Sequence, residues 1–420
     1  MVISMINRQN YKVLGTLCFI LLMINYKFFY LFRLPGTYAQ RTNEIPYTIA
    51  SVVIFVVIIV IYNLNNYKFN FLNFIILFYF FLLVEVFFTL FRYSDEPISN
   101  SLKVIVPFFS LVSYFIYSIF SQDNLKLFLK MIIIVSSIVG VISIIELYLY
   151  MKFGLSIFHV YGFNYGLTDD QASSINYLRN GRFRLIVNDL VEFSSVISIG
   201  CLFGKQFKNK IFLIVNIFIT VVYTFIVAQI RSVTLFIILI FALIYLLTKK
   251  IDKPMIYTFI FICFALALCL LYFFRNEVSM LINAQYSYYH RIDEIVFYFK
   301  RFVISPIFGN GLILGEKSLY NSQVVTGFDY IAPFSYSDVG IVGMVGEFGI
   351  LGLTIGAYLL IKIVRLYRST RNTIILAIAI MTLFSFINLS LLDAERLPIL
   401  AIYMAVIDGI CANCPEKGKS

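Results

Sequence analysis

Long apolar runs dominate the chain, and short polar connections separate most of them. Each run is long enough to cross roughly 30 Å of hydrocarbon as a helix. The pattern predicts about twelve membrane spans, or eleven if the short final run does not cross. The predicted spans lie near residues 13–32, 47–62, 71–91, 104–120, 131–150, 185–204, 211–228, 232–248, 255–274, 338–361, 372–391 and 397–410. We therefore expect an all-α polytopic membrane protein in which residues 1–420 form a single integral membrane domain.

Two polar segments are much longer than the other connections. Residues 151–184 follow the fifth predicted span, and residues 275–337 follow the ninth. Because connections are usually short, long ones often carry binding or catalytic groups. Residues 288–302 predict an amphipathic helix lying on the membrane, ended by Ser305-Pro306 and followed by a turn at Gly309-Asn310-Gly311. Its apolar stripe consists of Ile292, Ile295, Val296, Phe299 and Phe302.

Composition and charge support a membrane protein and predict its orientation. Apolar residues make up 61% of the chain and charged residues 13%, with a mean hydropathy of +0.90. If the N-terminus is cytoplasmic, most basic residues on short connections face the cytoplasm, as the positive-inside rule requires. Both termini are then cytoplasmic and both long segments face outward. Asn25 and Lys27 interrupt the first run without a cleavage pattern, so we expect it to remain as an anchor.

The basic residues on the two predicted sides differ in kind. The cytoplasmic side carries mainly lysine, whereas the exterior side carries mainly arginine. Arginine binds phosphate and carboxylate in a planar, bidentate manner, so the exterior arginines are candidate anion ligands. The alternative is that they pair with surface carboxylates. The net charge of +11 suits a membrane with anionic lipid, and no basic face with interleaved aromatic residues indicates nucleic acid.

Ionisable residues at the exterior ends of predicted spans are further candidates. Arg182 and Arg184 end the first long segment and lead into a polar helix. On that helix Asp189 and Glu192 share a face, and ionisable groups inside a span usually face an interior cavity. For Asp189 the alternative is a carboxylate placed favourably at a helix start.

Arg231 lies in the very tight turn between the seventh and eighth predicted spans. Its guanidinium either extends to lipid headgroups or points into a cavity. In the second case Ser232 could cap the next helix and leave free N–H groups beside the guanidinium, which would make an anion site.

The second long segment carries His290, Arg291 and Arg301, and Asp338 lies at the start of the following span. That span is rich in glycine from Gly343 to Gly356, and small residues at this spacing allow helices to approach closely. Cys411 and Cys414 form an isolated C-x-x-C without the four ligands of a zinc site, so no metal or other cofactor is expected.

Three stretches within roughly residues 180–360 form a recognisable series. They are Arg184 to Phe193; Gln229-Ile230-Arg231-Ser232; and His290 to Asp293 with Pro306 to Gly311, Ser337 to Gly340 and Gly346 to Gly352. Taken in order, they resemble the bacterial O-antigen and capsular polysaccharide polymerases (Wzy type) and the related O-antigen ligases. The ligases typically place a histidine before the last of these helices, where this chain has Asp338, which favours the polymerases.

The resemblance implies a GT-C-like helical bundle with a lipid-open exterior cavity in the bacterial cytoplasmic membrane. It implies that the enzyme polymerises oligosaccharide repeats linked to undecaprenyl diphosphate, without a nucleotide donor or a metal. The acceptor hydroxyl would attack the donor anomeric carbon, and lipid diphosphate would leave. Membrane lipids, a chain-length regulator and a flippase are the expected partners. The implied catalytic residues are Arg231, Arg291 and, as base, Asp338; the implied substrate-binding residues are Arg182, Arg184, Glu192, His290 and Arg301.

Two other functions remain open at this point. One is an O-antigen ligase, and the other is a lipid-linked oligosaccharide flippase or other transporter. A transporter would carry its polar groups near the bilayer midplane and could show two related halves. This chain has no internal repeat, and its polar groups are predicted to lie at the exterior rim.

Overall fold

The computed structural model shows a helical bundle with one short β-hairpin. It describes residues 2–32, 44–62, 64–94, 97–155, 157–158, 178–179, 182–183, 189–204, 206–248, 285–312, 334 and 336–414. The helices are α1 (Val2–Asn25), η1 (Lys27–Tyr30), α3 (Glu44–Ile61), η2 (Leu64–Asn66), α4 (Leu72–Arg92), α5 (Ile98–Ile105), η3 (Val106–Val112), α6 (Ser113–Phe153), α8 (Asp189–Phe203), α9 (Ile211–Val222), η4 (Tyr223–Val227), α10 (Arg231–Thr248), α13 (Gln285–Ile304), η6 (Tyr336–Val339), α15 (Gly340–Thr370), α16 (Thr373–Ser385), η7 (Ala394–Arg396) and α17 (Leu397–Asn413). The antiparallel strands are β1 (Leu178–Arg179) and β2 (Arg182–Phe183).

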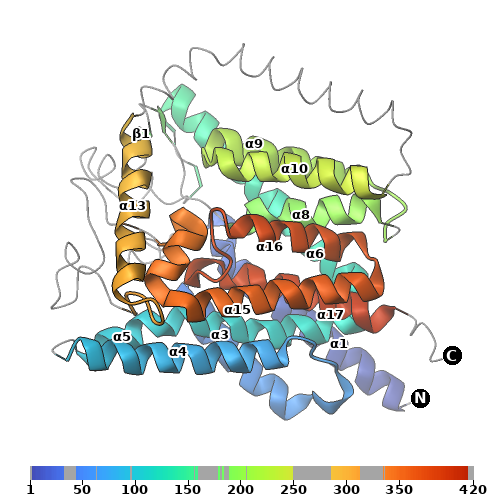
Figure 1. The fold of residues 1–420 in the computed structure, drawn as a ribbon. Coiled ribbons are helices and arrows are strands. Elements are labelled where there is room, and N and C mark those ends of the chain that lie inside the picture. Colours follow the sequence, from blue (N-terminus) through green and yellow to red (C-terminus); the bar gives the residue numbers. More distant parts are fainter. Residues whose placement is uncertain are drawn as a thin grey trace.

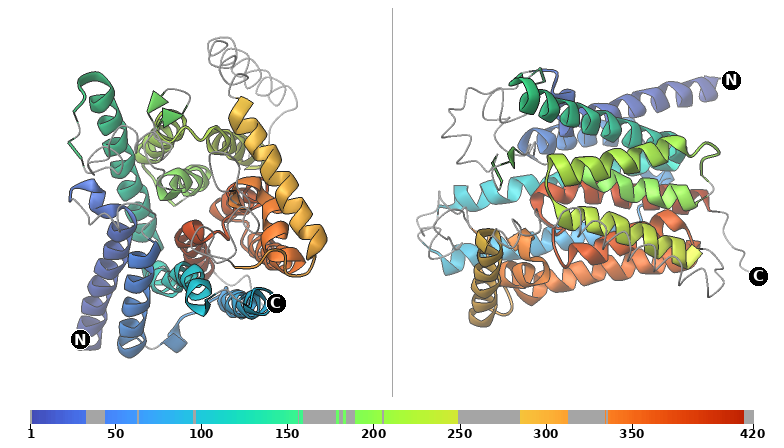
Figure 2. Two further views of the ribbon diagram at one scale, coloured as in Figure 1. Left: turned by 90° about the vertical axis from the view of Figure 1, so that its left-hand side faces the viewer. Right: turned by 90° about the horizontal axis from the view of Figure 1, so that it is seen from above.

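The long helices lie side by side, and α13 crosses one end of the bundle roughly at right angles to them (Figures 1 and 2). Helix α1 begins, and α17 ends, at the opposite end (Figure 1). Within the described residues, three helical stretches are long and apolar enough to cross a membrane: Leu72–Arg92, Leu102–Phe153 and Gly340–Thr370. The predicted all-helical class is confirmed apart from the hairpin. The predicted span 255–274 lies outside the described residues.

The fourth and fifth predicted spans form a single helical run that reverses direction. Asn124 breaks α6, with φ −151° and ψ 73°. Its side-chain carbonyl accepts a hydrogen bond from the Leu127 N–H at 3.0 Å, as an N-cap does for a new helix. The rings of Tyr117 and Phe128, one from each half of the run, lie 5.6 Å apart, far closer than eleven residues of straight helix would allow. The break therefore replaces the polar connection expected between the two spans.

Helix α17 lies in the bundle interior, and every residue from Leu397 to Ile410 is buried. A helix that is apolar all round is typical of such a position. Asp408 is the exception, and a buried carboxylate needs hydrogen-bond donors. It accepts hydrogen bonds from Tyr114, from Ser118 Oγ at 2.7 Å and from Asn70 Nδ2 at 2.8 Å. This network joins α17 to α6 and to the connection before α4.

Candidate functional site

Helix α13 turns its polar side toward the bundle and its apolar stripe away from it. Glu294 and Tyr298 are buried, whereas Ile295 and Phe299 are exposed. At Gly346 of α15, an added Cβ would lie 2.5 Å from the Tyr298 Cβ, so the glycine allows α13 to rest directly on α15. The predicted helix and its apolar stripe are confirmed, while its position on a membrane stays a prediction. Its outward apolar stripe suits the interface of a membrane whose plane lies across the bundle.

The turn after α13 inserts into a break in α15. The Asn310 N–H donates to the Gly346 carbonyl at 2.8 Å, and the Ile350 N–H donates to the Pro306 carbonyl at 2.8 Å. Gly349 makes the break, with φ 61° and ψ −160°, a conformation that is almost restricted to glycine. The Pro306–Gly311 and Gly346–Gly352 stretches are therefore two halves of one packed unit.

Replacing Gly349 should disrupt this unit. An alanine Cβ would lie 2.1 Å from the Ile307 carbonyl oxygen, in addition to the backbone strain. We expect Gly349→Ala to lower the free energy of unfolding by about 3 kcal/mol or more, as core overpacking and strain together do. Thermal unfolding of detergent-purified protein measures this. Gly154→Ala is the matched control, because Gly154 also has a positive φ (64°) but has no atom within 4 Å of an added Cβ. An equal loss of stability in Gly349→Ala and Gly154→Ala would show that the clash with Ile307 contributes nothing to the effect.

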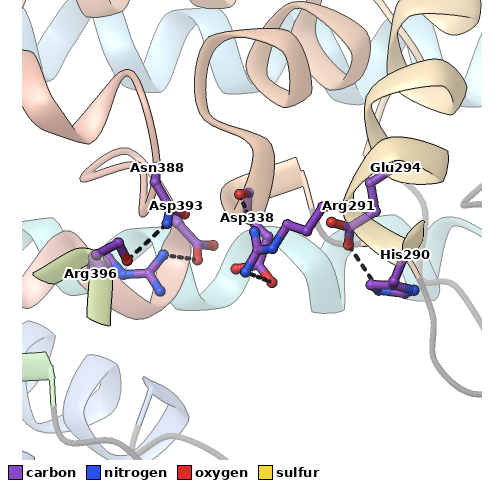
Figure 3. A network of polar contacts seen from close by, with 8 residues as sticks. His290, Arg291, Glu294, Asp338, Asn388, Asp393 and Arg396 are labelled. Carbon is purple, nitrogen blue, oxygen red and sulfur yellow. Dashed lines mark hydrogen bonds and ion pairs between the residues drawn. The ribbon is translucent and has the colours of Figure 1, made fainter. Parts of the chain in front are cut away.

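Two of the predicted catalytic residues are in direct contact. Arg291 Nη2 of α13 lies 3.2 Å from Asp338 Oδ2 of η6, and Nη1 also donates to the Asp338 backbone carbonyl. The two side chains are 34% and 35% exposed, so the pair is open to a ligand. Figure 3 shows Arg291 extending from its helix to Asp338. In this state each side chain neutralises the charge of the other.

His290 and Arg301 lie on the same helix but have other contacts. His290 Nε2 is 3.2 Å from Glu294 Oε1, one helical turn away, and its ring packs against Phe334. Arg301 lies ten residues beyond Arg291, or about 15 Å along the helix. Its guanidinium lies 5.0 Å from the centre of the Phe297 ring. Burial, and to a lesser degree Arg92, lowers the pKa of Arg301. The structure therefore does not bring Arg301 to the Arg291–Asp338 pair.

Arg231 is placed only through its neighbours. It is the first residue of α10, and its side chain, like that of Arg182 in β2 and the whole of Arg184, lies outside what the structure describes. Ser232 is already the second residue of the helix, and its hydroxyl accepts a hydrogen bond from Asn388 Nδ2 at 3.1 Å. The expectation that Ser232 caps α10 is corrected, because helix geometry already begins at Arg231.

The connection between α16 and α17 joins several of the candidate segments. Besides the contact of Asn388 with α10, the Phe386 carbonyl accepts a hydrogen bond from the Ile341 N–H at the start of α15, at 2.7 Å. The Tyr336 hydroxyl of η6 donates to Asp393 Oδ1 at 3.0 Å. Residues 386–396, which we call the hub segment, thus connect the starts of α10 and α15 to η6.

Arg396 is the charged centre of the hub segment and is only 6% exposed. Its Nη1 donates to Asp393 Oδ2 at 3.0 Å, and its Nε lies 3.4 Å from Asp189 Oδ2 at the start of α8. Burial alone would lower the pKa of Arg396, but Asp189 and Asp393 raise it above its ordinary value. Asp189 is thus both the first residue of its helix and the partner of a buried cation.

Glu192 lies one turn beyond Asp189 and is fully buried. Among the residues that the structure describes, neither of its carboxyl oxygens has a hydrogen-bond partner. In this state it cannot touch a bound oligosaccharide, although Asp189 and Arg396 both act on it electrostatically. Its expected substrate contact would require α8 to move.

Glu395 differs from its neighbour Arg396 in being exposed. Even so, surrounding protein groups desolvate its carboxyl, and together with Asp393 and Asp189 they raise its pKa to about 8, while Arg396 opposes the shift. Asp393, Glu395 and Arg396 were not among the site residues predicted from the sequence. Three ionisable residues within four positions, between two apolar runs, were the available signal.

The comparisons do not assign this chain to a family. No protein-family model matches it, and no curated protein matches its sequence. Within the described part of the chain, no three His, Cys, Asp or Glu side chains are grouped so as to hold a metal ion. The acids that contact Arg396, Asp189 and Asp393, form ion pairs with it.

Proposed function

We propose that this protein is a polytopic membrane glycosyltransferase that polymerises lipid-linked oligosaccharide repeats into a surface polysaccharide. It works at the exterior face of the bacterial cytoplasmic membrane, with both termini in the cytoplasm, about twelve spans and a GT-C-like arrangement. The donor and acceptor repeats are carried on undecaprenyl diphosphate. A flippase supplies them, and a chain-length regulator acts on the product.

The observation that carries the proposal is the meeting of Arg291 with Asp338. These residues come from separate parts of the third stretch of the resemblance, and they form a partly exposed ion pair at one end of the bundle. Pro306–Gly311 and Gly346–Gly352, two further parts of that stretch, pack on each other where α13 ends. The hub segment reaches the start of α10, where Arg231 lies. Convergence of distant segments on one accessible cluster is typical of an active site.

The leaving diphosphate gains negative charge during the reaction, so the site needs positively charged groups next to it. A guanidinium offers a planar fork of donors to phosphate oxygens. Diphosphate carries more charge than a carboxylate, so it displaces Asp338 from the Arg291 fork when substrate binds. Asp338 holds that fork in position while the site is empty. Arg231 is the second cation for the diphosphate, and Arg182 and Arg184, at the end of the first long segment, are the proposed substrate-binding residues.

Deleting the gene and measuring polysaccharide length on a gel tests the proposal. A polymerase predicts single-repeat glycans in the deletion strain and long chains on complementation. Long polymer that never reaches its final acceptor would instead indicate a ligase. Loss of all exterior glycan would indicate a flippase, since no repeat would then reach the outer face.

A further inference from the structure

The proposed reaction needs a group that takes the proton of the acceptor hydroxyl, and the Arg291–Asp338 pair makes Asp338 a poor choice. Arg291 contacts both the side-chain carboxylate and the backbone carbonyl of Asp338, so this carboxylate is already engaged by a guanidinium when substrate arrives. Asp338 is therefore suited to positioning Arg291.

Glu395 is the exposed carboxyl of the hub segment. It precedes Arg396, which Asp393 and Asp189 hold from two sides. These anchors fix the backbone of η7, so Glu395 is held at a defined place while Arg396 is buried. The Tyr336 hydroxyl of η6 donates to Asp393 at 3.0 Å, and Asp338 and Glu395 each lie two residues beyond one of these partners. The hydrogen bond therefore holds the part of the hub segment that carries Glu395 against η6, the helix that carries Asp338.

We propose that Glu395 is the catalytic base of the polymerisation, a role that rests on the proposed function. The acceptor hydroxyl oxygen bonds to the donor anomeric carbon, and its proton passes to the Glu395 carboxylate. The bond from that carbon to the diphosphate oxygen breaks, and lipid diphosphate leaves with the electron pair. Glu395 then releases the proton to water, to which it is exposed.

The surroundings of Glu395 suit this role. A general base works best when its pKa is near the working pH, and the pKa of Glu395 is raised to about 8. The charged groups that act on it are Asp189 of α8, Asp338 of η6, Lys27 of η1, and its neighbours Asp393 and Arg396. The acids raise its pKa, and Arg396 limits the rise.

The test is the pH dependence of polymerisation by purified protein in vesicles of bacterial lipid. The substrate is the lipid-linked single repeat extracted from the deletion strain, and the readout is the initial rate of ladder formation. The wild-type rate should rise about tenfold per pH unit and level off near pH 8. The initial rate of Glu395→Gln should be about 100-fold or more below the wild-type rate and should not rise with pH, because removing a general base costs at least that factor. Asp293→Asn, an exposed acid at the same end, is the matched control and should keep the wild-type profile.

Each outcome decides a different point. If wild-type protein makes no polymer from this substrate, the proposed function fails and the inference fails with it. If Glu395→Gln keeps the wild-type profile, or if Asp338→Asn abolishes the pH dependence while Glu395→Gln retains it, the base is not Glu395. If Glu395→Gln does not fold, Glu395→Asp is measured instead. A polymerisation rate roughly tenfold below wild type with the same pH slope would support Glu395 as the base, since small displacements of a catalytic group cost at least this much. A wild-type rate of Glu395→Asp at every pH would overturn the proposal.

Discussion

Arg291→Lys should shorten the surface polysaccharide to one or a few repeats while leaving the amount of protein in the membrane unchanged. Lysine keeps the charge but cannot reproduce the fork that now reaches both the carboxylate and the backbone carbonyl of Asp338. A charge-assisted hydrogen bond contributes about 1.5–3 kcal/mol. Losing one in the transition state slows the reaction roughly 10- to 100-fold. Gel analysis of polysaccharide from a complemented deletion strain gives the readout.

The control for this variant is Arg365→Lys. Arg365 is exposed on α15 toward the end of the bundle opposite α13, and it should tolerate the change. Chains of wild-type length from Arg291→Lys would remove Arg291 from the diphosphate site and leave its ion pair with Asp338 as a structural contact.

Arg396→Met should destabilise the protein strongly. The substitution removes the partner of Asp189 and Asp393 while both carboxylates stay in place, beside the buried carboxyl of Glu192. Breaking a buried ion pair from one side typically costs about 3–5 kcal/mol. We expect little monodisperse protein in detergent and a much lower unfolding temperature. Fluorescence-detected size exclusion after heating measures both.

Two further variants show whether charge is the cause. Combining Arg396→Met with Asp189→Asn and Asp393→Asn removes the uncompensated charges and should recover part of the stability. Arg365→Met should have little effect, because Arg365 is exposed. Full stability of Arg396→Met alone would show that the hub segment is held by its backbone contacts.

The helices and the surface helix were predictable because their signals are local. A long apolar run predicts a helix long enough to span the hydrocarbon core of a membrane. Helices α4 and α15 coincide with such runs. The stripe on α13 recurs at helical spacing, and Pro306 and the glycines after it mark where that helix ends. The contact of His290 with Glu294 follows the same local rule, since residues four apart share a helix face.

The hub segment was not predictable, because its partners are distant in sequence. Arg396 pairs with Asp189, and Tyr336 bonds to Asp393, through helix packing that no spacing rule encodes. Asp189 and Glu192 looked equivalent on one helix face, yet Asp189 has an arginine partner, whereas Glu192 is buried without a hydrogen bond to any residue that the structure describes. Burial and pairing depend on which helix packs where.

By itself, the sequence determined the helical class, the positions of α4, α13 and α15, and which residues carry charge at the two ends. These follow from hydrophobicity and backbone preference, which act over a few residues. Only the tertiary structure decided that Arg291 meets Asp338, that Arg396 is the buried centre of the hub segment and that Glu395 is left exposed beside it. The reason is physical: a charge in a low-dielectric interior is stabilised by whichever opposite charge packing brings within a few ångströms.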